Sequence, residues 1–181
     1  MTDMAPRRIA GATADETAFR ELMCAFPSGV TVVTTRDRDG TPRGLTCTSM
    51  CSVSLHPPIL LACLHNHSET LAAMLARGSF AVNLLHAGGK GAAEVFAGPV
   101  ADRFVEVEWE TTPWGGLPWL SADAHAVAEC AVAGSVEAGD HVVVFGEVAD
   151  VMAEPEQPLL YGLRQYAAWT AADGRVIPLR R

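Results

Sequence analysis

The sequence has little positive charge. It holds 13 lysine and arginine residues against 21 aspartate and glutamate residues, which gives a formal net charge of −8. DNA, RNA and anionic membrane surfaces attract cationic proteins, so this balance disfavours them as partners. No apolar run approaches the roughly 20 residues that a membrane-spanning helix needs, and the first residues lack the apolar stretch of a secretory signal. We therefore expect a cytoplasmic protein.

Two kinds of motif are also missing. The five cysteines are odd in number and form no C-x-x-C pair, which argues against a zinc ribbon and favours reduced thiols. The dinucleotide signature G-x-G-x-x-G is absent. The glycine-rich segment at 86–91 ends in Gly-Lys-Gly rather than in the Gly-Lys-Ser/Thr of a phosphate-binding loop. A Rossmann domain and a Walker loop are therefore not predicted.

The composition supplies enough apolar material for one hydrophobic core. Of 181 residues, 49% are hydrophobic and 19% are charged, which fits a single folded domain and argues against disorder. The mixed Ala, Thr, Pro and Arg start predicts a loose arm over residues 1–14. We place the domain at 15–170 and a C-terminal tail at 171–181.

Short β-branched or apolar segments alternate with turn signals along the domain. We expect six or seven strands, among them 30–35, 44–54, 59–64, 80–85, 126–136 and 142–152. The third of these is predicted to be buried on both faces. Helices are expected at 15–24, from 66–69 to 77, and at 92–96. Hairpin turns such as Asp39-Gly40 join most strands, which predicts an antiparallel barrel or sandwich with helices over its gaps.

Two segments near the C-terminal half are less regular. Residues 109–120 carry three tryptophans and two prolines, and we expect a loop that serves as a packed lid or an oligomer contact. The chain from Pro155 onward has a mixed composition that predicts no particular element.

A row of small hydroxyls follows the first hairpin turn. The segment GLTCTSMCSVS at 44–54 contains five such side chains: Thr46, Thr48, Ser49, Ser52 and Ser54. On strand alternation the two threonines share one face, and the last two serines share another. Composition alone favours a Thr/Ser-rich edge strand followed by a turn.

Five motifs in order give this row a second interpretation. They are FPSGVTVVTT at 26–35, DG at 39–40, GLTCTSMCSVSLHPP at 44–58, GSFAVNLL at 78–85 and GDHVVVFGEV at 139–148. Over roughly residues 17–168 the chain resembles the flavin reductase-like family. The resemblance implies a mainly β fold with short helices, an FMN-binding split β-barrel of the Greek-key antiparallel type. It also implies a homodimer that transfers hydride from NADH or NADPH to FAD or FMN and releases reduced flavin to a separate monooxygenase.

With this resemblance, the hydroxyl row becomes a candidate track for a flavin. Small side chains let the backbone approach the ring edge, while hydroxyls can bind the ribityl chain; several neutral contacts of about 1 kcal/mol each give weak, reversible binding. The candidate residues are Thr46, Cys47, Thr48, Ser49, Ser52, Val53 and Ser54, with the cysteine contributing backbone atoms.

The start of the second expected helix is a candidate phosphate site. Asn66, Ser68 and Thr70 lie there, and free N–H groups at a helix start favour an anion. The alternative is that Asn66 or Ser68 only caps the helix. Family members often carry a cation here, a position that His65 or His67 could take over. A zinc site at these two histidines lacks a third ligand.

Four further residues are candidates by their match to family segments or by their chemistry. His141 is expected near the nicotinamide, where it could orient the carboxamide or stabilise charge developing on the flavin; Asp140 beside it is predicted to form the turn. Arg103 is either a basic group near the cofactors or a solvated surface residue. Asn83 is a candidate polar contact, and Tyr166 a candidate for stacking on a ring.

Two other functions remain open. The chain could be a non-catalytic flavin- or haem-binding carrier or sensor of the same barrel type. It could also be an oxidase of the pyridoxamine-phosphate type, but such a site needs several Arg and Lys residues, and only Arg43 is available beside the hydroxyl row. The lack of an arginine cluster for a 2′-phosphate favours NADH over NADPH.

Overall fold

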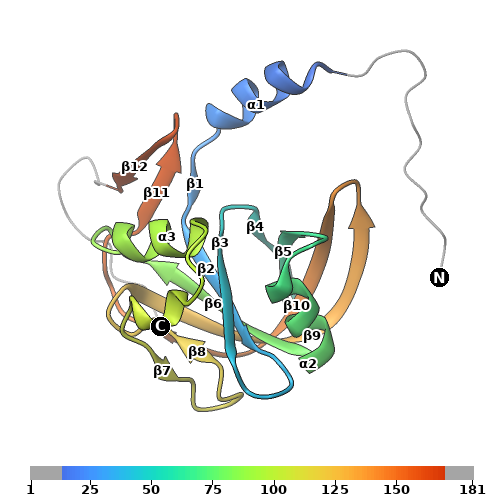
Figure 1. Ribbon diagram of the computed structural model, residues 1–181, viewed down its shortest axis with the longest axis vertical. Coiled ribbons are helices and arrows are strands. Elements are labelled where there is room, and N and C mark those ends of the chain that lie inside the picture. The colour runs from blue at the N-terminus through green and yellow to red at the C-terminus, as the bar shows by residue number, and fades with distance from the viewer. Residues whose placement is uncertain (1–13, 170–181) are drawn as a thin grey trace.

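A seven-stranded antiparallel sheet forms the centre of the computed structural model, which describes residues 14–169 (Figure 1). Its strands follow the order β3-β2-β6-β9-β10-β5-β4. Their bounds are Thr31–Arg36 (β2), Pro42–Cys47 (β3), Met50–Leu55 (β4), Pro58–His65 (β5), Ser79–Leu85 (β6), Ala124–Ala138 (β9) and His141–Ala153 (β10). The predicted antiparallel, mainly β architecture is confirmed. The predicted arm and tail lie outside the described residues, apart from residue 14.

The two outermost strands of this sheet are consecutive in sequence. β3 and β4 are separated only by Thr48 and Ser49, although they lie at opposite ends of the strand order. The sheet therefore curls until its ends approach each other: the Cys63 amide of β5 donates to the Ser49 carbonyl at 3.2 Å. The single strand predicted for 44–54 is wrong in this respect, because the chain leaves one end of the sheet and enters the other.

A β-bulge interrupts β4. Ser52 pairs with Leu60 and Ser54 pairs with Ile59, so Val53 has no partner across the ladder. Directly paired residues point to the same face of an antiparallel pair, and neighbours along β5 point to opposite faces. The two serines therefore lie on opposite faces, and the expectation that they share one is wrong.

Both predicted hairpin turns are present. Gly40 closes the β2–β3 turn with φ of +89°, and Gly139 begins the β9–β10 turn with φ of +66°. Both values lie in the left-handed region that glycine enters at no steric cost. The second turn places His141 at the first residue of β10, directly opposite His65 at the end of β5.

One face of β5 is buried and the other is not. Leu60, Ala62 and Leu64 point into the core, whereas Ile59 and Cys63 on the opposite face are half-buried. The prediction of burial on both faces is therefore wrong for the single chain. A continuous apolar run does not distinguish a strand buried on both faces from one whose outer face is only partly covered.

The concave side of the sheet holds the main core. Val33, Phe80, Val144 and neighbouring strand residues pack there against Leu71 and Met74 of α2 (Glu69–Arg77). Ser68 caps this helix by accepting from the Leu71 amide, and Gly78 ends it with φ of +76°. The helix is as predicted, and Ser68 rather than Asn66 caps it; Leu75 of this helix is 42% exposed.

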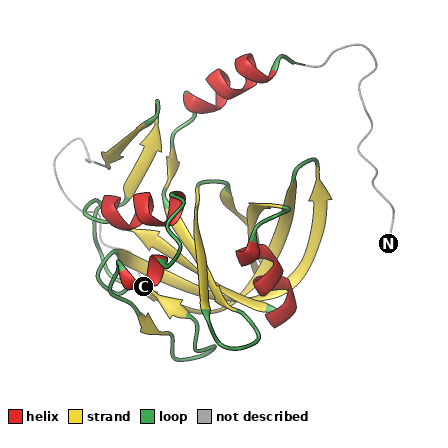
Figure 2. Cartoon of the chain, in the orientation of Figure 1, coloured by secondary structure: helices red, strands yellow, loops and turns green. Residues whose placement is uncertain are grey.

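A second core lies on the other side of the sheet. α3 (Lys90–Ala97) and the 3-10 turn η1 (Arg103–Val105) contribute Phe96 and Phe104, whose rings meet edge to face at 5.0 Å. A small sheet of β1 (Ser28–Gly29), β11 (Leu159–Gly162) and β12 (Gln165–Ala168) borders this layer. The β11–β12 hairpin was not predicted from the sequence. In Figure 2, α3 and the β11–β12 hairpin lie on the left of the view, and α2 lies on the right.

The tryptophan-rich loop is anchored to the sheet. It contains the short strands β7 (Glu110–Thr111) and β8 (Pro118–Trp119). The carboxylate of Glu129, a residue only 2% exposed, accepts from the Trp114 amide at 3.1 Å and the Gly115 amide at 2.5 Å. This buried carboxylate therefore holds the tip of the loop against β9.

The first helix stands apart from the rest of the chain. α1 (Glu16–Cys24) begins after the Asp15 cap, within the predicted range of 15–24, but none of its residues is buried, and it projects beyond the sheet (Figure 1). Its apolar residues Phe19, Leu22 and Met23 are 54%, 67% and 46% exposed. Over residues 14–169, no helix is both long enough and apolar enough to cross a membrane.

Candidate functional site

The exposed hydroxyls gather where the two ends of the sheet meet. Thr48 and Ser49 are both exposed at the β3–β4 connection. The Ser49 hydroxyl donates to the Cys63 carbonyl at 2.9 Å, and the Cys47 sulfur lies 3.5 Å from the same hydroxyl. This short connection therefore offers a ligand one exposed threonine, one partly engaged serine and the main chain between them.

The first part of the hydroxyl row serves the fold. The Thr46 hydroxyl donates to the Ala93 carbonyl of α3 at 2.7 Å. The Cys47 side chain is buried, and its carbonyl accepts from the Thr31 hydroxyl at 2.7 Å. These two residues tie β3 to its neighbours, which leaves their side chains little freedom to bind a ligand.

The last part of the row is divided by the bulge at Val53. Ser52 lies on the face of Leu60, while Ser54 lies on the opposite face and accepts from the His56 amide at 3.2 Å. The five hydroxyls therefore do not form the continuous track expected from strand alternation. The structure brings together Thr48 and Ser49 and separates them from Thr46 and Ser54.

The predicted phosphate residues lie close to each other at the start of α2. The Ser68 hydroxyl caps the helix at 3.4 Å from the Leu71 amide, and Thr70 is buried in the first turn. The backbone N–H of Asn66 donates to the backbone carbonyl of Asp140 at 3.0 Å, and this bond joins the segment to the β9–β10 turn. Capping is therefore observed for Ser68, and it does not exclude a phosphate at the remaining N–H groups.

A cavity of about 960 Å³ lies next to this helix start. Its walls are residues 41–45 of the β2–β3 hairpin, residues 68–70 at the start of α2, residues 99–105, and Trp109. The Trp109 ring is also contacted by the Arg36 guanidinium at 5.2 Å from its centroid. The volume falls in the range of small-molecule sites. The cavity brings together three of the predicted residues: Ser68, Thr70 and Arg103.

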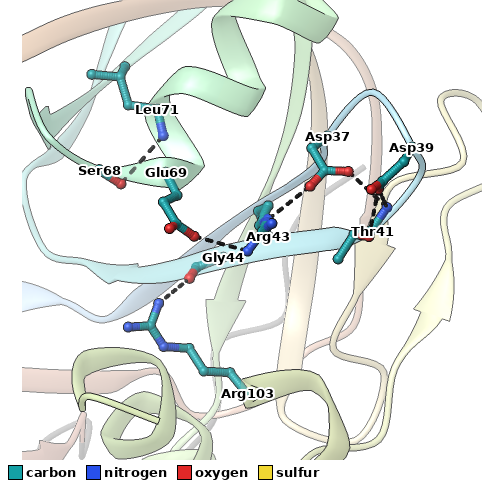
Figure 3. Close-up of polar contacts among 9 residues, drawn as sticks. All are labelled: Asp37, Asp39, Thr41, Arg43, Gly44, Ser68, Glu69, Leu71 and Arg103. Atoms are coloured by element: carbon teal, nitrogen blue, oxygen red, sulfur yellow. Dashed lines mark hydrogen bonds and ion pairs between the residues drawn. The ribbon is translucent and has the colours of Figure 1, made fainter. Parts of the chain in front are cut away.

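Two arginines border the cavity (Figure 3). Arg103 donates to the Gly44 carbonyl at 2.7 Å and to the Gly98 carbonyl at 2.9 Å, so it is neither a solvated surface residue nor free to swing. Arg43 pairs with Asp37 at 3.0 Å and with Glu69 at 2.9 Å. Sequence reasoning did not place Arg43 in the site, and only its position beside the hydroxyl row could have indicated it.

His141 is one of three neighbouring histidines where β5 ends and β10 begins. Its Nδ1 donates to the Asp140 carboxylate at 2.7 Å, and this hydrogen bond lowers the pKa of Asp140. The His141 ring lies 5.5 Å from that of His65, which lies 5.4 Å from that of His67. Asp140 forms the turn, as predicted, and in addition orients His141. Among residues 14–169 no group of His, Cys, Asp or Glu is arranged to hold a metal ion.

Asn83 lies in the core rather than in the site. It is fully buried, and its amide nitrogen donates to the Val32 carbonyl at 3.0 Å and to the Thr34 hydroxyl at 3.1 Å. Its amide oxygen accepts from the Leu120 amide at 2.9 Å. With both ends of the amide engaged, Asn83 is explained by the fold, and we remove it from the candidate site.

Tyr166 packs within the β11–β12 hairpin. Its ring centroid lies 5.1 Å from that of Tyr161, and the Lys90 ammonium lies 6.0 Å from the ring. Burial raises the pKa of Tyr166. Tyr166 is half-buried against the second core, so a ligand ring could contact only the exposed part of the tyrosine ring.

Fold and site together define a class of protein: a small, curled antiparallel sheet with a cavity of small-molecule size and exposed hydroxyls at the β3–β4 connection. The sequence matches the family described as "Flavin reductase like domain" over residues 23–170. This chain belongs to the flavin reductase-like family, as the motif order predicted.

Individual relatives agree with this family assignment. A protein named flavin reductase (NADPH) from Lentzea aerocolonigenes is 53% identical over 160 residues, which cover 88% of this chain and 94% of the relative. A flavin reductase (NADH) from Kitasatospora aureofaciens is 49% identical over 94% of this chain and 88% of the relative. The reductase subunit HsaB of a flavin-dependent monooxygenase from Rhodococcus jostii is 33% identical over 87% of this chain and 80% of the relative.

A solved structure shares the fold. The NADH:FAD oxidoreductase of Streptomyces globisporus C-1027, in complex with NAD and FAD fragments, superposes with a TM-score of 0.82. It is 34% identical to this chain, and the match covers 89% of this chain and 96% of that structure.

Proposed function

We propose that the β3–β4 connection, the start of α2 and the start of β10 form one site, at which this chain moves a hydride from a reduced nicotinamide cofactor to a flavin. The chain is an NAD(P)H:flavin oxidoreductase, because its similarity to named flavin reductases extends over almost the whole of both chains. The same observation disfavours the alternative of a non-catalytic carrier.

Uncharged groups would hold the ring and the ribityl chain of the flavin. Thr48, Ser49 and the adjoining main chain are exposed where the sheet ends meet, and small side chains allow close approach of a flat ring. Asn66 and Ser68 lie at the helix start, where the backbone N–H groups suit a phosphate. The cavity beside them has room for the remainder of a flavin nucleotide. When bound, the flavin supplies the ring nitrogen that accepts the hydride.

His141 would orient the nicotinamide. A carboxylate only accepts hydrogen bonds, so the His141 Nδ1 that contacts Asp140 carries the proton. The Nδ1–Oδ1 distance is 2.7 Å, and this bond fixes the orientation of the His141 ring. The His141 side chain is 44% exposed, which leaves its other nitrogen available to a substrate. Hydride transfer requires alignment of donor and acceptor rather than a general base, so orientation is the role that this pair can fill.

The relatives suggest how the product is used. One of them is the reductase subunit of a flavin-dependent monooxygenase, and weak flavin binding through mainly neutral contacts suits an enzyme that passes reduced flavin to such a partner. All five cysteines are free thiols, which supports a cytoplasmic location. The preference for NADH over NADPH stays a prediction, since the relatives include both kinds.

The exposed apolar face of α1 supports a homodimer. A nine-residue helix is marginal alone, and this one buries nothing against its own chain. We infer that a second copy covers Phe19, Leu22, Met23 and Phe26, which are 46–67% exposed.

A simple assay tests the function. The purified protein is mixed with NADH or NADPH and with free FAD or FMN, and the absorbance of the reduced nicotinamide is followed. The rate should rise with the concentration of free flavin. A yellow protein that retains its flavin and consumes no reduced nicotinamide would be a carrier, and the proposal would be withdrawn.

A further inference from the structure

We propose that Arg43 is the cation that binds the flavin phosphate in this protein, and that Glu69 is the carboxylate that the phosphate displaces. The inference rests on the proposed function, since it assigns a residue to the phosphate end of the flavin. The ligand chemistry is a phosphate monoester or a pyrophosphate, as in FMN or FAD.

The start of α2 needs a cation because it carries a carboxylate of its own. Glu69 is the first residue of the helix, next to the N–H groups that an incoming phosphate would use. Two like charges cannot share these groups without a compensating positive charge. Neither His65 nor His67 is among the described residues that line the cavity; they lie on the side of His141.

Arg43 is placed to supply that charge. It lines the cavity from β3, and its Nη1 lies 2.9 Å from the Glu69 carboxylate. Its Nε donates to Asp37 at 3.0 Å. In Figure 3 the Arg43 side chain stands between these two carboxylates and reaches across toward the helix start.

The two carboxylates differ in how firmly they hold the guanidinium. The side chain of Asp37 is 23% exposed and that of Glu69 is 81% exposed. An ion pair with so exposed a partner adds little stability, so Glu69 can leave at low cost. Asp37 would keep Arg43 in position while a phosphate takes the place of Glu69 at Nη1. Guanidinium and phosphate match in geometry as well as in charge.

The other charged groups at the cavity do not fill this role. Arg103 donates to the Gly44 and Gly98 carbonyls, and these bonds direct its terminal nitrogens to the backbone. Asp102 also lines the cavity and adds negative charge. Arg43 is therefore the guanidinium at this cavity whose present partner is an exposed side chain that can be replaced.

The test compares ligands with and without a phosphate. Riboflavin shares the ring and ribityl chain of FMN but has no phosphate. Arg43→Gln should raise the Kd for FMN and FAD about tenfold, since a charge-assisted contact is lost, while the Kd for riboflavin stays the same. Glu69→Gln should lower the Kd for FMN, because a competing carboxylate is removed. Arg38→Gln, an equal charge change in the exposed β2–β3 turn, is the matched control.

Each alternative result has a definite meaning. If Arg43→Gln raises the Kd for riboflavin as much as the Kd for FMN, the ion pair is only structural and the inference fails. The inference also fails if Glu69→Gln raises the Kd for FMN. If Arg43→Gln raises the KM for NADPH alone, the phosphate belongs to the nicotinamide cofactor and the flavin assignment is wrong. A parent protein with no flavin-dependent oxidation of NADH or NADPH would instead refute the proposed function. Thermal unfolding of each variant identifies any loss of fold.

Discussion

Asp140 and His141 share a hydrogen bond of 2.7 Å at the proposed nicotinamide site. His141→Gln removes the imidazole while keeping a polar side chain, and we expect kcat/KM for the nicotinamide cofactor to fall about 10- to 100-fold. The Kd for flavin should not change, because His141 is assigned to the other substrate. Asp140→Asn retains an acceptor oxygen and should cause a smaller loss.

Steady-state kinetics with each substrate varied in turn measure these effects. Equal losses for flavin and nicotinamide would show that His141 acts through the fold, and the orienting role would have to be abandoned.

The threonines on either side of Cys47 form a second matched pair. Thr48 is exposed at the proposed flavin site, whereas the Thr46 hydroxyl is bound to the Ala93 carbonyl. Thr48→Val should raise the flavin KM about fivefold with little change in kcat, which corresponds to one lost hydrogen bond of about 1 kcal/mol. Thr46→Val should instead lower the free energy of unfolding by about 1 kcal/mol and leave the KM unchanged. If Thr46→Val raised the flavin KM and Thr48→Val only lowered the stability, the proposed position of the flavin would be wrong.

At this scale, sequence patterns predicted residue types better than their positions. A cluster of small hydroxyls was visible in the sequence, and two of its members, Thr48 and Ser49, are exposed at the proposed site. The bulge at Val53 could not be predicted, because it depends on pairing with a strand that follows in the chain. Asn83 likewise meets its acceptors on β2 and its donor at Leu120, which are distant in sequence.

Close packing between β10 and its neighbours gives a prediction at the level of elements. A Cβ at Gly146 would overlap the Phe80 ring and lie 2.9 Å from the Cys130 Cβ, inside the main core. Gly146→Ala should therefore destabilise the protein by about 1–3 kcal/mol through overpacking. Gly134 on the adjacent strand β9 has nothing within 4 Å of the same position, so Gly134→Ala is the control. Denaturant unfolding would show equal stability of the two variants if this account is wrong.

Elements with standard turn signals were predicted, and those without them were not. The Asp39-Gly40 and Gly139-Asp140 turns have glycine at positive φ, and both hairpins were expected from the sequence. The β11–β12 turn places Leu163 and Arg164 at φ of 51° and 59°, which such residues rarely adopt. A sequence with no glycine at these two positions gives no indication of a hairpin.

The whole molecule is expected to contain two chains. Leu22→Glu places a charge on the apolar face of α1 and should convert the homodimer to monomers. Thr17→Glu adds the same charge on the opposite side of the helix and should leave the assembly intact. Light scattering after size-exclusion chromatography measures the mass of each. If the parent protein is already a monomer, the proposed homodimer is wrong.

Stability is expected to fall in mild acid because of a half-buried histidine. Burial lowers the pKa of His125 from its ordinary value of 6.5, and its Nδ1 is buried with no partner among the described residues. Below about pH 6.5 the unfolded chain binds a proton that the folded chain resists, so the free energy of unfolding decreases as the pH falls. Asp140, whose pKa is lowered, contributes with the same sign but at more acidic pH.

His125→Gln should reduce this dependence. Melting temperatures from pH 8 to pH 5 should fall less steeply in the variant than in the parent protein. Parallel curves would show that another group carries the effect.

The convergence of the sheet's two ends has a consequence for solubility. Sheets that stay open end in strands with unpaired amides and carbonyls, which can recruit a strand from a neighbouring molecule and begin aggregation. Here the outermost strands run into each other through Thr48 and Ser49, and the Ser49 carbonyl is already engaged by the Cys63 amide. The connection proposed to receive the flavin thus also protects this corner of the two edge strands from a strand of a neighbouring molecule.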